Sequence, residues 1–333
     1  MNCHNNKIII ISGPTALGKS KIGIELAKRI NGEIISIDSM QVYKHMDIGT
    51  AKITKDEMQG IKHYMIDEID VSDNFNVKDF KEKTDKYIKE IQNNDKIPIL
   101  IGGTGFYINA ILYDTDFLEE DETKKEIILN ELSDELTTYG KDHMHDKLKK
   151  IDPESAEIID KNNTKRVLRA LLYYQMHNEK ISIHNKKAQE KAPQYNALCF
   201  FLNDERKKLY ENIDNRVDLM IKQGLVKEIC DLISKYKAKK NSNAMQAIGY
   251  KELYDFCDKL IINNDINKSY EDLKSNKCFS EIIDKIKQHS RNYAKRQITW
   301  FKNKTLATEI RVDKFSYDKE KILQKIVFDF KNL

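Results

Sequence analysis

The residues with the clearest potential for chemistry lie near the start of the chain, in the segment Gly13–Ser20 with the sequence GPTALGKS. This segment matches the pattern G-x-x-x-x-G-K-[ST], which binds phosphate groups when it joins a strand to a helix. Its two glycines allow successive backbone N–H groups to turn towards one anion, and the helix N-terminus adds partial positive charge. Lys19 can then neutralise a phosphate, and the Ser20 hydroxyl can bind Mg²⁺.

The segments on either side of this loop supply the context that the pattern requires. The isoleucine-rich run Lys7–Ile11 predicts a buried strand, and Lys21–Lys28 has the spacing of an amphipathic helix. A glycine-rich turn with a solvated lysine is the alternative, but a strand and a helix at the two ends disfavour it. The sequence therefore predicts a phosphate loop.

Two further polar clusters follow predicted buried strands. Asp38 comes after the run Glu33–Ile37, and the glycine-rich segment Gly102–Gly105 follows Ile97–Ile101. Ligands of open α/β sheets bind at the carboxyl ends of the strands. Asp38 can hold Mg²⁺ through water or act as a general base there, or it can simply cap a turn. Thr104 points a hydroxyl into the same crevice, unless its glycines mark only a tight turn.

The order of the expected elements indicates an α/β fold: a P-loop NTPase-like parallel sheet flanked by helices, with an all-helical insertion. No convincing strand lies between about residues 115 and 197, and the β signal returns at Leu198–Leu202. We therefore expect a core of residues 1–114 and 198–333 and an insertion of residues 115–197. The expected later elements are helices at 204–223, 245–258 and 279–300, a strand at 309–312 and a helix at 318–330.

The helix expected at Thr164–Met176 separates an apolar stripe from a basic one. Lys165 and Arg169 are four residues apart and Arg166 and Arg169 are three apart, so they share one face. Binding to a nucleic-acid backbone and a merely solvated face remain equally open from this feature alone. A second basic set lies near the end of the chain, at Arg291, Lys295 and Arg296.

Composition sets broad limits on the class of protein. The 333 residues carry a formal net charge of +4, which does not by itself indicate a nucleic-acid-binding protein. The five cysteines are far apart and form no C-x-x-C pair, which argues against a disulfide framework or a cysteine zinc site. His143 and His145 are two residues apart and would not face one another on a helix, so we reject a metal site there. With no run of about 18 apolar residues, we expect no membrane span and a cytoplasmic protein.

Taken together, these segments resemble the bacterial tRNA dimethylallyltransferases (tRNA isopentenyltransferases). The resemblance runs in the right order from about residue 7 to residue 302. It is carried by the phosphate loop, Asp38–Tyr43 (DSMQVY), Met46–Lys52 (MDIGTAK), Gly102–Thr104, Arg166 with Arg169, and Ala294–Phe301 (AKRQITWF).

The resemblance implies transfer of a dimethylallyl group from dimethylallyl diphosphate to N6 of adenosine 37, next to the tRNA anticodon. Asp38 would be the general base, and Thr104 would contact the flipped adenosine or the departing diphosphate. The diphosphate, with Mg²⁺ on Ser20, would be bound by Gly13, Pro14, Thr15, Ala16, Leu17, Gly18, Lys19, Ser20 and Arg216. The tRNA anticodon stem-loop would be bound by Asp38, Ser39, Met40, Gln41, Thr104, Lys125, Lys165, Arg166 and Arg169.

Two positions depart from the family pattern. Leu17 replaces the usual serine of the loop, and Asn212 stands where an arginine is expected, one turn before Arg216. Two other functions compete with the transferase: a P-loop kinase of nucleosides or small molecules, and a non-enzymatic RNA-binding protein with a vestigial loop. Turnover of ATP without tRNA would favour the kinase. We expect a monomer.

Overall fold

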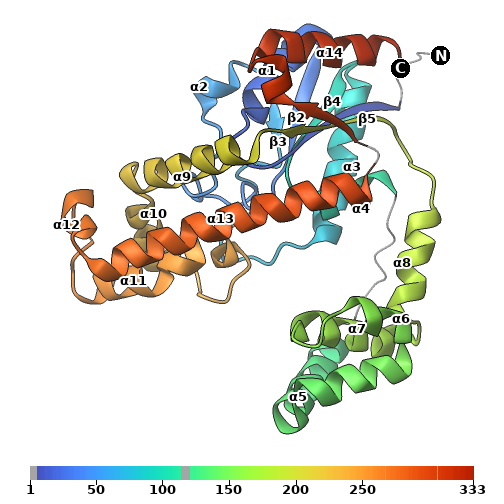
Figure 1. Cartoon of the computed structure of the whole chain (residues 1–333), viewed down its shortest axis with the longest axis vertical. Helices are drawn as coiled ribbons and strands as arrows, with labels where there is room; N and C mark the ends of the chain where they lie inside the picture. Colours follow the sequence, from blue (N-terminus) through green and yellow to red (C-terminus); the bar gives the residue numbers. More distant parts are fainter. Residues whose placement is uncertain (1–5, 114–120, 267, 306) are drawn as a thin grey trace. The chain divides into compact units, whose positions relative to one another are not determined.

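The computed structural model describes residues 6–113, 121–266, 268–305 and 307–333. The chain forms two compact units, one made of residues 1–112 and 195–333 and the other of residues 113–194. Figure 1 shows the strands gathered in the first unit and helices alone in the labelled part of the second. The division predicted from the sequence fell at 114/115 and 197/198.

The first unit is built on a six-stranded parallel sheet in the order β3-β2-β4-β1-β5-β6. Isoleucines fill β1, so both faces of this central strand are buried, as in parallel sheets covered by helices on both sides. The strands are β1 (Lys7–Ser12), β2 (Gly32–Ile37), β3 (His63–Tyr64), β4 (Ile97–Gly102), β5 (Asn196–Asn203) and β6 (Thr308–Arg311). The predicted α/β fold is confirmed, and the chain re-enters the sheet at β5.

The register of the sheet brings three loops to one edge. Gly102, the last residue of β4, pairs with Ser12 of β1 on one side and with Ile37 of β2 on the other. The chain therefore leaves the sheet at the same level before the phosphate loop, before Asp38 and before Gly103. A Cβ on Gly102 would lie 2.1 Å from the Ile37 carbonyl oxygen, so this close packing requires glycine.

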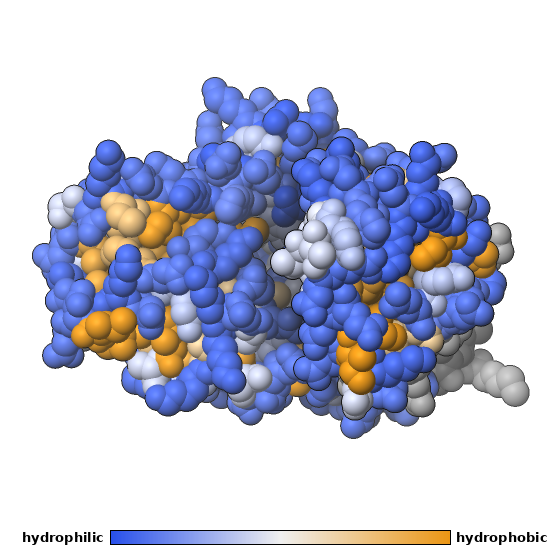
Figure 2. All heavy atoms as spheres, turned by 90° about the horizontal axis from the view of Figure 1, so that it is seen from below, coloured by the Kyte–Doolittle hydropathy of each residue, from blue (hydrophilic) through white to orange (hydrophobic). Residues whose placement is uncertain are grey.

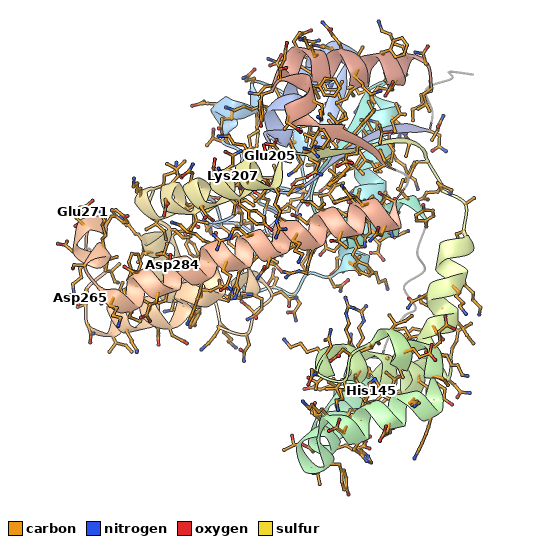
Figure 3. The ribbon with its side chains drawn as sticks, in the orientation of Figure 1. His145, Glu205, Lys207, Asp265, Glu271 and Asp284 are labelled. Carbon is orange, nitrogen blue, oxygen red and sulfur yellow. The ribbon has the colours of Figure 1, made fainter. Side chains whose placement is uncertain are left out.

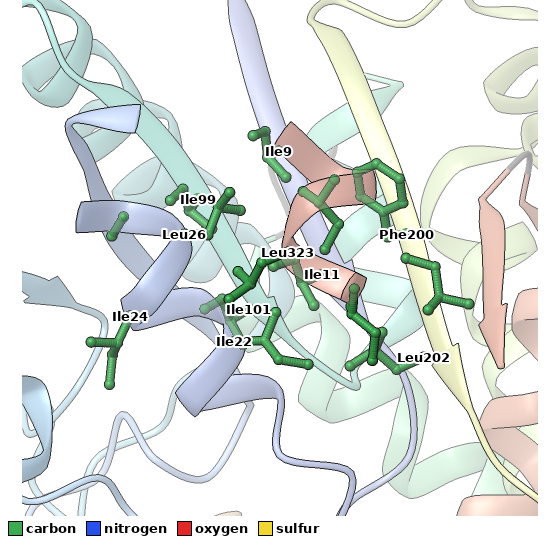
Figure 4. Packing of buried hydrophobic residues seen from close by; sticks show 14 of the residues in the cluster. Ile9, Ile11, Ile22, Ile24, Leu26, Ile99, Ile101, Phe200, Leu202 and Leu323 are labelled. Atoms are coloured by element: carbon green, nitrogen blue, oxygen red, sulfur yellow. The ribbon is translucent and has the colours of Figure 1, made fainter. Parts of the chain in front are cut away.

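Helices cover both faces of the sheet. Figure 4 shows the core on one face, where Ile22 and Leu26 of the first helix and Leu323 of the last pack on Ile11 and Leu202 of the strands. The helices of this unit are α1 (Lys19–Ile30), α2 (Lys55–Met58), α3 (Val77–Asn93), α4 (Gly105–Leu112), α9 (Arg206–Lys222), α10 (Leu225–Ser234), α11 (Tyr250–Ile262), α12 (Tyr270–Lys274), α13 (Lys277–Lys304) and α14 (Lys319–Lys331), with 3₁₀ turns at Ala244–Gln246 and Val312–Phe315.

One expected helix is wrong. The sequence predicted a single helix over 245–258, but the structure has a 3₁₀ turn at Ala244–Gln246 and starts α11 only at Tyr250. Gly249 between them has φ 96°, a left-handed conformation that cannot continue a helix. Its N–H donates to the Glu252 carboxylate at 2.7 Å, so the break serves as the start of α11.

The second unit consists, in its described part, of the helices α5 (Glu122–Ile151), α6 (Pro153–Ile158), α7 (Thr164–His177) and α8 (Ile181–Glu190). Gly140 interrupts α5 with φ 79° and ψ 174°, so two helical segments meet there at a kink. The Asn163 side chain caps α7. A separate hydrophobic core, which includes Leu132, Met144, Leu148, Val167 and Leu171, holds these helices together.

The surface is mostly hydrophilic, with scattered hydrophobic side chains, as Figure 2 shows for one face. Ile158, Ile262 and Phe328 are among the exposed apolar residues, and isolated residues of this kind are ordinary on a protein surface. Among the described residues, every helix is either too short or too polar to cross a membrane.

Candidate active site

The phosphate loop has the backbone shape of an anion site. Positive φ angles occur at Gly13 (136°), Ala16 (67°) and Gly18 (73°), so the chain curls round before α1 begins. Gly18 is the N-terminal cap of α1 and no side chain accepts a hydrogen bond there. The N–H groups of the first turn are therefore available to an anion. A Cβ on Gly13 would lie 2.4 Å from the Leu202 carbonyl oxygen, so only glycine fits next to β5.

The site includes two cationic side chains, Lys19 and Arg216. Lys19 at the start of α1 donates from Nζ to the Pro14 carbonyl oxygen at 2.7 Å. Burial, with Arg216 of α9 as the second cause, lowers the pKa of Lys19 to about 7, while Asp38 opposes that shift. Burial also lowers the pKa of Arg216, again opposed by Asp38. A bound polyanion would favour the charged forms of both partly buried side chains.

Asp38 directly follows β2 and is half-buried. Its Oδ1 accepts the Met40 N–H at 2.9 Å, which fixes the carboxylate in a tight turn. Within the described residues, Oδ2 has no hydrogen-bond partner, so it remains able to accept a proton. Its negative charge opposes the lowering of the pKa of both Lys19 and Arg216.

Helix α13 closes the third side of the site, at the end of β4. Gln297 donates from Nε2 to the Gly103 carbonyl oxygen at 2.8 Å, and a Cβ on Gly105 would strike the Trp300 ring. Burial, with Asp38 second, raises the pKa of Tyr293 to about 12, while hydrogen bonding to Thr104 works in the opposite direction. Tyr293 thus links Thr104 to the surroundings of Asp38.

Gln41 connects the end of β2 to the loop that contains Thr50. Its amide oxygen accepts from the Ser36 hydroxyl at 3.0 Å, and its amide nitrogen donates to the Thr50 carbonyl oxygen at 3.2 Å. Arg216 reaches the same carbonyl at 3.5 Å. Ser39 and Met40 lie half-buried in the turn between Asp38 and Gln41. The structure therefore places Lys19, Asp38, Gln41, Thr104 and Arg216 in the loops and helices that follow β1, β2, β4 and β5.

The other predicted residues lie in the second unit. Lys165, Arg166 and Arg169 are exposed on α7, while Val167 and Leu171 of the same helix are buried. No ion pair of these three basic residues occurs within the described part of the chain. Lys125 lies in the first turn of α5.

Lys161, which lies just before α7, does not extend this basic stripe. It forms an ion pair with Asp142 at 2.7 Å. Likewise, Arg291 of the second basic set is paired with Asp214 of α9 at 2.6 Å, so it joins two helices. Lys295 and Arg296 are exposed. The first set therefore keeps Lys165, Arg166 and Arg169 exposed, whereas the second keeps only Lys295 and Arg296 exposed.

The histidines of the second unit serve packing. His145, labelled in Figure 3, donates from Nε2 to the carbonyl oxygens of Ile159 at 2.9 Å and Ala156 at 3.1 Å. His143 pairs with Glu135 at 3.0 Å. No cluster of three or more potential metal-binding side chains of His, Cys, Asp or Glu was found in the described ranges.

Sequence reasoning did not single out Tyr293 or Gln297 as site residues. Both lie on the helix that carries Ala294–Phe301, a segment that contributed to the family resemblance. The signal was therefore present, but the contacts of Tyr293 and Gln297 with β4 depend on how α13 packs, which local patterns do not specify.

Comparison with known proteins identifies the family. The model of the IPP transferase family matches residues 41–304. The chain belongs to this family. A tRNA dimethylallyltransferase of Acetivibrio thermocellus is 41% identical over 97% of both chains, and one of Lachnoclostridium phytofermentans is 45% identical over 89% of this chain and 88% of its own.

Solved structures extend the family likeness to the whole fold. A tRNA Δ²-isopentenylpyrophosphate transferase of Staphylococcus epidermidis is 40% identical, with a TM-score of 0.66 over 98% of this chain and 99% of its own. A eukaryotic dimethylallyltransferase acting on tRNA is 27% identical, with a TM-score of 0.70 over 92% of this chain and 74% of its own. IPP transferases modify adenosine 37 of tRNA. Membership in this family decides against the kinase that the phosphate loop alone left open.

Proposed function

We propose that this IPP transferase moves a dimethylallyl group from dimethylallyl diphosphate to the exocyclic N6 of adenosine 37 in the anticodon stem-loop of tRNA. The observation that carries the proposal is the geometry at the carboxyl ends of the strands. The phosphate loop with Lys19 follows β1 and Asp38 follows β2, while Arg216 reaches the Thr50 carbonyl oxygen that Gln41 also contacts. The two cations can bind the diphosphate of the donor. The carboxylate can accept a proton from the amine that replaces the diphosphate on the allylic carbon. We further propose that the enzyme acts as a monomer in the cytoplasm.

The phosphate loop binds the diphosphate of the donor in this proposal. The bond between the allylic carbon and the diphosphate oxygen breaks, and negative charge builds up on the leaving group. The available backbone N–H groups of the phosphate loop, the Lys19 ammonium and the Arg216 guanidinium stabilise that charge. Leu17 offers no hydroxyl to the diphosphate, so backbone groups and the two cations supply the contacts.

Asp38 acts as the general base. The N6 nitrogen attacks the allylic carbon, a new C–N bond forms, and the amine proton passes to the free carboxylate oxygen of Asp38. Thr104 and the turn Ser39–Gln41 border the target base. An adenosine in a loop must leave its stack to enter such a site, which costs roughly a few kcal/mol.

The residues present fit Mg²⁺ bound mainly through the substrate. Ser20 is exposed in the first turn of α1, where a hydroxyl can reach an ion held by a diphosphate. Mg²⁺ prefers oxygen ligands and keeps several waters, so it needs no dedicated cage of carboxylates. When bound, it would neutralise charge on the departing diphosphate.

The second unit grips the tRNA. Lys165, Arg166 and Arg169 present three unpaired positive charges on one exposed face of α7, and Lys125 of α5 adds a further basic residue. Contacts of such residues with phosphates position a nucleic acid without reading its sequence. They should also make binding sensitive to salt.

The direct test is mass spectrometry of digested tRNA after incubation of the protein with dimethylallyl diphosphate and Mg²⁺. The proposal predicts an isopentenyl mass increment on adenosine 37, without consumption of ATP. A parallel incubation with ATP and no donor measures phosphate release. Absence of the increment in active, folded protein would contradict the proposal.

A further inference from the structure

The carboxylate of Glu228, which lies outside the site, holds the loop of residues 47–50 in place. Glu228 lies in the first turn of α10 and is half-buried. Its Oε2 accepts the N–H groups of Asp47 at 2.9 Å and Ile48 at 2.7 Å. Its Oε1 accepts the Gly49 N–H at 3.1 Å and the Tyr250 hydroxyl at 2.7 Å. One side chain thus fastens three consecutive backbone groups of the loop to helices α10 and α11.

These four bonds match the chemistry of a carboxylate and of no other side chain. Four donors converge on two oxygens, and an ionised carboxylate offers about four acceptor positions and no donor. Burial and Glu228 hold the pKa of Tyr250 well above its usual value, so the hydroxyl keeps its proton and donates. A glutamine would have the same shape, but its NH₂ group would face N–H or O–H donors.

The loop held by Glu228 ends at a carbonyl that two site residues share. Gln41 donates to the Thr50 carbonyl oxygen at 3.2 Å and Arg216 approaches the same oxygen at 3.5 Å. The Thr50 hydroxyl turns back to the Met46 carbonyl oxygen at 2.6 Å, which closes the loop on itself. A Cβ on Gly49 would lie 2.4 Å from the Tyr250 ring, so the loop is also packed tightly against α11.

We propose that Glu228 is a positioning residue for both substrates: it fixes the loop of residues 47–50, which in turn orients Arg216 towards the diphosphate and Gln41 towards the target base. Glu228 touches neither substrate in this account. The inference rests on the proposed function for the roles of Arg216 and Gln41. Binding of pyrophosphate tests the part that concerns Arg216 without any need for catalysis.

The test compares E228Q with the matched control D231N. Asp231 is on the same helix, and its carboxylate forms an ion pair with Lys235 at 3.0 Å. We expect E228Q to weaken pyrophosphate binding by about tenfold and to raise the KM for the donor, while D231N leaves both within about twofold. E228D keeps an all-acceptor head group and should recover part of the affinity. Y250F removes one of four bonds and should have a smaller effect than E228Q.

A double-mutant cycle with R216A separates positioning from general weakening of the fold. If Glu228 acts through Arg216, E228Q should weaken pyrophosphate binding by less than about threefold in the R216A background. Thermal unfolding of each variant identifies those that fold. If E228Q does not fold, E228D and Y250F carry the same comparison with D231N.

Two results would overturn the inference: an unchanged donor KM in E228Q, or full additivity with R216A. A loss confined to kcat would indicate only a smaller folded fraction. If the wild type binds pyrophosphate but forms no isopentenyladenosine, the proposed function fails, and the binding data still decide the role of Glu228.

Discussion

The two units of this transferase use charge in opposite ways. In the first unit, Lys19 and Arg216 are partly buried, and burial lowers the pKa of both while Asp38 opposes the shift. On α7 of the second unit, Lys165 and Arg169 are exposed and the helix buries only its apolar face. Burial of the charges of Lys19 and Arg216 is energetically unfavourable in the free protein, and an anionic ligand can offset it. The exposed charges of α7 carry no such desolvation penalty.

Because of this difference, we expect the first unit to determine the reaction and donor binding, and α7 to contribute to tRNA affinity. Charges in a partly buried site interact strongly and respond to changes of a single group, whereas exposed charges are screened by salt and act additively. Substitutions in the first unit should therefore change the rate or the binding of the donor. Substitutions on α7 should change tRNA affinity and its salt dependence.

The largest effect is expected for Asp38→Ala. Loss of the general base should lower the rate of prenyl transfer by roughly 10²–10⁴, while tRNA binding stays within about tenfold because the basic residues of α7 are untouched. Single-turnover rates and filter binding of tRNA measure the two quantities. A variant with nearly wild-type turnover would remove Asp38 from this role.

The next effect concerns the glycines of the phosphate loop. In Gly13→Ala, the new Cβ would lie 2.4 Å from the Leu202 carbonyl oxygen, at a position with φ 136°. In Gly18→Ala, the position has φ 73° and no atom lies within 4 Å of the new Cβ. A left-handed conformation costs an alanine about 1–2 kcal/mol. We expect Gly13→Ala to lose more than about tenfold in donor affinity and Gly18→Ala about fivefold or more. Equal losses in calorimetric titrations would show that the contact with β5 is unimportant.

Binding of the diphosphate should take up a proton. The pKa of free Lys19 is about 7, and a bound anion favours the charged lysine, so its pKa rises in the complex. Pyrophosphate affinity should therefore fall as pH rises above 7, by up to about tenfold per pH unit. Lys19→Met serves as the control for titration of the ligand itself. Identical pH profiles of wild type and Lys19→Met would contradict the low pKa of this lysine.

The smallest effect should come from the exposed basic face. Arg166→Ala combined with Arg169→Ala removes about two phosphate contacts, so the slope of log K against log salt should fall by about 1.5. Lys161→Ala is the matched control, because Lys161 already pairs with Asp142 at 2.7 Å. An unchanged slope in the double variant would mean that this face of α7 is only solvated.

Much of the fold could be predicted from the sequence because its signals are local. The isoleucine run of β1, the glycine that interrupts α5 at position 140 and the Asn163 cap of α7 each depend on neighbouring residues. The break before α11 was missed because Gly249 adopts φ 96° within an otherwise helical pattern. Short α12 and α8 were also missed.

The site was predictable to the extent that it lies at strand ends. Parallel strands bring their carboxyl ends together, so Asp38 and Thr104 could be grouped with the phosphate loop before the register was known. Tyr293, Gln297 and Glu228 act through contacts made by α13 and α10, far away in the sequence. Their positions follow from helix packing, which has no signature in any short segment.

The most direct measurement is a crystal structure of the protein with Mg²⁺ and dimethylallyl S-thiolodiphosphate, a donor analogue that reacts slowly. The account predicts the diphosphate within hydrogen-bond distance of the available backbone N–H groups of the phosphate loop, Lys19 and Arg216, with Asp38 beside the allylic carbon. A structure in which the analogue binds elsewhere, or in which Asp38 points away from it, would contradict the account.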